Sequence, residues 1–159
     1  MKYPEGQIIK VGDLVWWNEG VYIGFVEEIM NTPEEYIPYE NEAPALLLTN
    51  LHPFESNMIK HKQHIGLPWT GGSCTYEESD IEDEGIGLLS THERKEFEWA
   101  VAQAKNKVSS DLRNKPFCAR AEMDMTRMEE DWKIDFVDSS CNILASVVIA
   151  FNSNTRTDA

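Results

Sequence analysis

Between Ser90 and Met125 the chain reads STHERKEFEWAVAQAKNKVSSDLRNKPFCARAEMDM, and the spacing of its apolar residues changes once, at Pro116. After Pro116 apolar and polar residues alternate, which is typical of half-buried strands. Before Pro116 the apolar residues recur every three or four positions, as in an amphipathic helix; they are Phe97, Val101, Ala104, Val108 and Leu112. A long helix followed directly by strands predicts an α+β fold.

The ends of this helix have their own signals. Ser90 and Glu93 form a Ser-x-x-Glu capping box, in which each side chain accepts a backbone amide of the other, so the helix is predicted to begin there. It is predicted to end before Pro116. Beyond it, alternation continues through Trp132, Ile134 and Phe136, which predicts an antiparallel β meander. The apolar run 143–151 is predicted to be a central strand of that meander.

The first 58 residues are predicted to form a small antiparallel β module. Strands are expected at 8–17 and 21–30, joined in a hairpin by the turn Asn18-Glu19-Gly20, and a short apolar strand at 45–51. The segment 31–44 holds three Pro and four acids and is predicted to be an exposed connection.

Residues 59–89 are expected to be an irregular acidic loop region, because they combine Pro and Gly with the acid run 77–84. The chain is therefore interpreted as a single domain, 1–159, in three parts: the β module 1–58, the loop region 59–89, and the helix with the meander, 90–159.

Two short motifs resemble the opening of SH3-like or Tudor-like barrels: Val11-Gly12-Asp13-Leu14-Val15-Trp16 and, after a turn, Gly24-Phe25-Val26. This resemblance implies a peptide-binding module that uses Trp16, Trp17 and Tyr22. Together with Phe25 these side chains could form an aromatic cage for methylated Lys or Arg through cation–π attraction. The competing interpretation, which we favour, is that alternate members fill a core.

The charge is strongly negative and unevenly distributed. With 14 Lys and Arg against 28 Asp and Glu, the net charge is 14 − 28 = −14. Residues 1–59 carry ten acids and two Lys, 60–92 six acids and two Lys, and 93–159 twelve acids and ten bases, so the excess belongs to the first 92 residues. Such a chain is not expected to bind nucleic acid or an anionic membrane, and its partners should be neutral or basic.

No catalytic or metal-binding residue is predicted, and no cofactor is expected. His52, His61 and His64, with Cys74 nearby, are the only cluster of metal-ligand types, but they lack a paired spacing, and the histidines are interpreted as solvated loop residues. Cys74 follows Gly71-Gly72-Ser73 without the elbow that presents a nucleophile, and nearby acids would make its thiol less reactive.

The chain is expected to work in the cytoplasm. Its three Cys are odd in number and far apart, which suits reduced thiols. It has no signal-peptide pattern at its start and no apolar run near the roughly 20 residues that span a bilayer.

Two acidic loops predict a surface that docks a basic protein. Such surfaces speed encounter, and aromatic side chains among the acids favour hot spots. The predicted contacts are Glu34, Glu35, Tyr36, Tyr39, Glu77, Glu78, Asp80, Glu82, Asp83 and Glu84. A small, acidic α+β protein with free thiols and a Trp-rich opening resembles bacterial immunity proteins. That resemblance implies a one-to-one complex with a cognate toxin domain, a basic nuclease or nucleic-acid-modifying enzyme whose cleft the carboxylates occlude, with no chemistry performed by the chain itself.

Overall fold

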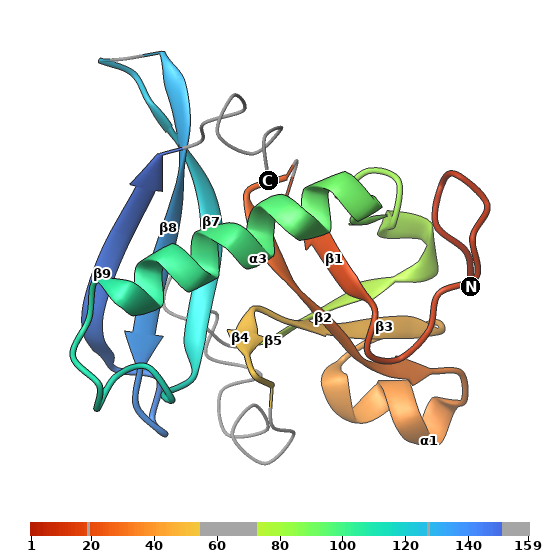
Figure 1. Ribbon diagram of the computed structural model, residues 1–159. Helices are drawn as coiled ribbons and strands as arrows, with labels where there is room; N and C mark the ends of the chain where they lie inside the picture. Colours follow the sequence, from red (N-terminus) through yellow and green to blue (C-terminus); the bar gives the residue numbers. More distant parts are fainter. Residues whose placement is uncertain (19, 55–72, 127, 151–159) are drawn as a thin grey trace.

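A computed structural model describes residues 1–18, 20–54, 73–126 and 128–150. It contains one curled antiparallel sheet with a long helix across one face, which confirms the α+β class (Figure 1). The strands are β1 (Leu14–Trp17), β2 (Tyr22–Met30), β3 (Ala45–Thr49), β4 (Leu51–His52), β5 (Ser73–Glu77), β6 (Gly87–Leu88), β7 (Phe117–Asp124), β8 (Glu129–Val137) and β9 (Ile143–Ala150). The helical elements are α1 (Pro33–Tyr36), η1 (Ile37–Tyr39), η2 (Glu78–Asp80) and α3 (Thr91–Asn106).

The sheet has the order β5-β3-β2-β7-β8-β9, with β1 paired to β2 and β6, and β4 paired to β7. The predicted N-terminal β module is thus continuous with the C-terminal meander. The two parts meet where β2 pairs with β7, Tyr22 opposite Arg120 and Ile23 opposite Ala119.

The predicted hairpin and helix are present, although the first strand begins at Leu14 and not at residue 8. Strands β1 and β2 pair antiparallel, and Asn18 and Gly20 have positive φ in the turn between them. At the start of α3, the Ser90 hydroxyl accepts the Glu93 amide at 3.1 Å and the Glu93 carboxylate accepts the Ser90 amide at 2.9 Å. The helix buries Phe97, together with Ala100 and Ala104, against the sheet.

The helix is shorter than its apolar stripe predicts. It ends at Asn106, and Leu112 lies in the turns beyond it. The Arg113 side chain donates to the Lys105 carbonyl at 3.0 Å. A carbonyl in the last turn of the helix thus receives its hydrogen bond from a residue beyond the helix. Ser, Asp and Asn residues follow, and these favour turns over a continued helix.

The position predicted for the last strand is wrong. The meander β7-β8-β9 forms as expected, but β9 is an edge strand that pairs only with β8 among the described strands. The apolar side chains of β9 point to both faces of the sheet. Val147 and Ile149 are buried, whereas Ile143, Leu144 and Val148 are exposed. A nearly continuous apolar sequence therefore did not mean a strand covered on both faces.

The region 59–89 is more regular than predicted. Residues 73–77 form β5, which pairs along the whole of β3, and η2 and β6 follow it. The buried side chains of Ile81 and Ile86 anchor the turn between η2 and β6 in the core. The connection 31–44, expected to be exposed, contains α1 and η1, and a Pro lies at the start of each. The remaining part of the loop prediction, 59–72, lies outside the described residues.

Candidate functional site

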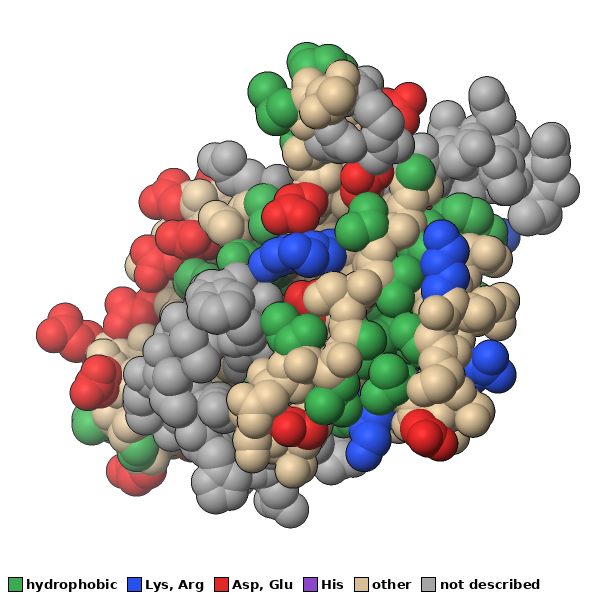
Figure 2. All heavy atoms as spheres, turned by 90° about the vertical axis from the view of Figure 1, so that its left-hand side faces the viewer, with side chains coloured by type: hydrophobic (Ala, Val, Ile, Leu, Met, Phe, Trp, Pro, Cys, Tyr) green, Lys and Arg blue, Asp and Glu red, His purple; other side chains and the backbone are tan. Residues whose placement is uncertain are grey.

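The two predicted acidic segments lie next to each other. Strand β3 follows the first segment and β5 precedes most of the second, and Ala45 pairs with Glu77. The Glu78 amide donates to the Pro44 carbonyl at 3.0 Å, and the Glu42 amide donates to the Glu77 carboxylate at 2.7 Å. In Figure 2 many acidic side chains gather along the left edge of the view, away from the meander that faces the reader.

Two of the predicted contact acids use their carboxylates to build this region, and a third is half-buried. The Glu35 carboxylate accepts the Asn31 and Thr32 amides and the Thr32 hydroxyl, which lowers its pKa, the hydroxyl bond contributing most. Glu77 holds the Glu42 amide, as described above. Glu84 is half-buried, and its backbone carbonyl accepts the Asn18 amide at 2.9 Å. The Glu35 and Glu77 carboxylates therefore hold the segments in place rather than project from them.

The two predicted contact tyrosines pack partly inside. Tyr36 and Tyr39 are half-buried against a small apolar cluster of Met30, Ala45 and Leu47. Burial raises the pKa of Tyr39, and the Glu28 and Glu27 carboxylates raise it further. Both rings thus anchor α1 and η1 on the sheet, with part of each left at the surface.

The other five predicted acids are exposed, and we call them the acidic surface: Glu34, Glu78, Asp80, Glu82 and Asp83. The ion pairs found among the described residues, His92–Glu96 and Arg120–Glu122, involve none of them. Lys2 is a nearby cation, and it lines a shallow hollow of about 540 Å³ together with Glu78 and Glu82. The acidic surface therefore keeps a negative excess.

The four N-terminal aromatic residues do not line one cage. Trp17 is only 2% exposed, lies 5.9 Å from the Tyr22 ring, and packs in the core formed with Val26. Trp16 and Phe25 pack against the other core cluster, the one beneath α3. Neighbouring positions in a strand point to opposite faces, so this division follows from the backbone.

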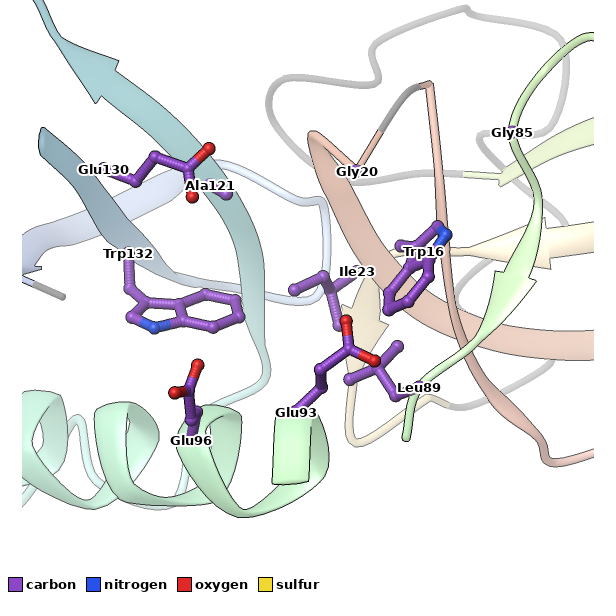
Figure 3. Close-up of a pocket in the computed structure, with 10 residues that line it drawn as sticks. All are labelled: Trp16, Gly20, Ile23, Gly85, Leu89, Glu93, Glu96, Ala121, Glu130 and Trp132. Carbon is purple, nitrogen blue, oxygen red and sulfur yellow. The ribbon is translucent and has the colours of Figure 1, made fainter. Parts of the chain in front are cut away.

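A second concave site lies between Trp16 on β1 and Trp132 on β8. It has a volume of about 470 Å³. Figure 3 shows both indoles, the Glu93 and Glu96 carboxylates rising from α3, and Glu130 above Trp132. The full lining is Trp16, Gly20, Ile23, Gly85, Leu89, Glu93, Glu96, Ala121, Glu130 and Trp132. We call it the Trp16–Trp132 pocket.

Sequence reasoning missed this pocket. Its walls come from β1, α3 and β8, and only the pairing of β2 with β7 brings these elements together. One local signal was present: Glu93 and Glu96 are three residues apart, so they lie on the same side of a helix.

The structure also describes two of the residues considered for metal binding and catalysis, His52 and Cys74. His52 is buried rather than solvated, so that part of the prediction is wrong. His61 and His64 lie outside the described residues. Burial raises the pKa of the Cys74 thiol, and the Glu84 carboxylate raises it further. Within the described ranges no group of three or more His, Cys, Asp or Glu side chains could hold a metal ion.

A search of the helices in the described part of the chain found none with the length and hydrophobicity needed to cross a membrane. Comparison with protein-family models, with curated proteins and with solved structures found no match to this chain.

Proposed function

We propose that this protein is a cytoplasmic immunity protein, which binds a basic toxin domain and neutralises it by occlusion. The observation that supports this proposal most is the junction of the two acidic segments, where the Glu78 amide bonds to the Pro44 carbonyl. The five carboxylates of the acidic surface are exposed, and the two ion pairs found among the described residues involve none of them. A surface of this kind attracts positive charge.

The physical basis is charge complementarity. A nuclease or another enzyme that modifies nucleic acid needs a positively charged cleft to hold phosphates. Carboxylates that enter such a cleft meet the same Lys and Arg side chains, and the opposite charges accelerate association. Occlusion requires rigid presentation, and the hydrogen bonds of Glu35 and Glu77 to nearby backbone amides provide it.

Capture followed by a growth assay tests the proposal. The purified chain, immobilised, is expected to retain a basic protein from a lysate of its own source cells. Expression of that captured protein alone should arrest bacterial growth, and co-expression of this chain should restore it.

Two results would refute the assignment: a captured protein whose expression leaves growth unaffected, or growth arrest that persists when this chain is co-expressed at an equal or higher level. A folded chain with a single surface Glu98→Gln change serves as the positive control, because Glu98 is exposed on α3 and lies outside both the acidic surface and the pocket lining.

A further inference from the structure

The Trp16–Trp132 pocket has two aromatic walls held in place by their surroundings. Trp132 is buried, and its ring lies 5.7 Å from that of Phe97 on α3. Trp16 lies against Gly87 of β6, where a Cβ atom would be 2.7 Å from the indole Nε1. The absence of a side chain at Gly87 therefore gives the Trp16 indole its place beside the pocket.

The same pocket collects negative charge. Glu93 and Glu96 enter from α3 and Glu130 from β8, and none of the described residues that line it is Lys, Arg or His. Glu93 is oriented by its bond to the Ser90 amide. His92 lies 2.9 Å from the Glu96 carboxylate, but its side chain is 66% exposed while that of Glu96 is 14% exposed. Glu96 is thus the partner that turns inward.

These two properties select a class of ligand. An anion would be repelled by three carboxylates, and a purely apolar molecule would remove water from them without giving any hydrogen bond in return. An organic cation satisfies both features, because its charge is attracted by the indole faces and by the carboxylates while its hydrocarbon stem covers the apolar floor of Ile23 and Ala121. The volume lies in the range of small-ligand pockets.

We propose that the Trp16–Trp132 pocket binds an organic cation, a guanidinium or alkylammonium group on a short hydrocarbon stem. The group can come from a free small-molecule cation or from an arginine or lysine side chain of a bound protein. This site is separate from the acidic surface, so it stands even if the immunity function fails.

Titration with matched probes tests the proposal. Two probes are titrated, N-acetyl-arginine-N-methylamide as the protein side chain and ethylguanidinium as the free small-molecule cation. Binding is followed by the indole N–H signals in NMR spectra. The signals of Trp16 and Trp132, assigned with Trp→Phe variants, should shift and that of Trp17 should not. The citrulline analogue, which replaces the guanidinium by a neutral urea, should bind at least tenfold more weakly. An arginine probe that binds tighter than ethylguanidinium identifies a protein side chain as the source, and equal affinity identifies a free small-molecule cation.

Variants separate charge from fold. Glu93→Gln with Glu96→Gln should weaken binding tenfold or more, and Gln preserves the capping bond at Glu93. Gly87→Ala should also weaken it by displacing the Trp16 indole, with no change in charge. Glu98→Gln, on the same helix, should leave affinity within twofold. Equal binding of the citrulline analogue, no shift at 10 mM probe, or an equal loss in Glu98→Gln would overturn the proposal.

Discussion

Replacement of Gly24 by Ala is expected to destabilise the protein by about 4 kcal/mol or more, a large part of the roughly 5 to 15 kcal/mol by which a typical domain is stable. Gly24 lies in β2 at the point where this strand changes partners. Residues before it pair with β7 and residues after it pair with β3. The backbone at Thr49 and Asn50 passes directly over this position.

The clash would be with backbone, so it cannot be relieved by a side-chain rotation. A Cβ atom at Gly24 would lie 2.6 Å from the Thr49 carbonyl carbon, 2.7 Å from the Asn50 Cα and closer still to the Thr49 carbonyl oxygen. Thr49 and Asn50 are both buried. Relief would require β3 and β4 to move away from β2, which breaks the centre of the sheet.

Gly20→Ala provides the matched control. Gly20 has a φ of +84° in the turn between β1 and β2, and a Cβ there would meet no atom within 4 Å. Its cost is confined to backbone strain of about 1 to 2 kcal/mol. Urea unfolding followed by circular dichroism measures both variants. A loss of stability in Gly24→Ala no larger than that in Gly20→Ala would show that the close approach is absent.

Acid is expected to destabilise the protein because His52 is buried in its neutral form. The free energy of unfolding should fall by about 3 kcal/mol between pH 7 and pH 4 through this group. His52 stacks on Phe117 at 5.0 Å and lies close to Phe25 and Phe97. Its Nε2 lies 2.8 Å from the Ile23 carbonyl oxygen. A carbonyl only accepts, so the neutral ring carries its proton on Nε2 and donates it.

Burial lowers the pKa of His52 from its ordinary 6.5 to about 4, and the Ile23 hydrogen bond opposes that shift only in part. Between these two pH values the unfolded chain takes up a proton that the folded chain does not. The contribution of His52 to the free energy of unfolding is therefore fully present above pH 6.5 and is lost progressively as the pH falls towards 4.

His52→Gln isolates the effect, because the Gln amide can donate to the same carbonyl and does not titrate. The free energy of unfolding, measured by urea titration from pH 7 to pH 4, should fall less steeply in His52→Gln than in the natural chain. Parallel pH profiles would exclude His52 as the acid-sensitive group.

Local signals in the sequence predicted the local structure well. The capping box at Ser90, the turn at Gly20 and the alternation after Pro116 each specify backbone geometry within a few residues, and all three are confirmed. The sheet order was not readable in the same way. Two features depend on which distant strands pair: β5 joins β3, although the segment 55–72 separates it from β4 in the sequence, and β9 lies at an edge of the sheet.

The candidate sites show the same division. The composition located the acidic segments, but it could not tell bonded carboxylates from exposed ones. The carboxylates of Glu35 and Glu77 accept backbone amides, whereas Glu82 is exposed. The Trp16–Trp132 pocket required tertiary structure, because its two indoles are more than a hundred residues apart and meet only through the joined sheet.

The central claim is that the acidic surface binds a basic protein. Its most direct test is the rate of association with the captured toxin, measured by surface plasmon resonance at low and moderate salt. Glu82→Lys with Asp83→Lys reverses two exposed charges on this surface, and Glu98→Lys with Asp111→Lys makes the same change in net charge on α3 and the turn after it.

We predict that the first pair lowers the association rate at least tenfold and flattens its dependence on salt, while the second pair stays within about threefold of the natural chain. Equal slowing by both pairs would show that only net charge matters, and no slowing by the first pair would place the contact elsewhere on the molecule. Either result contradicts the claim.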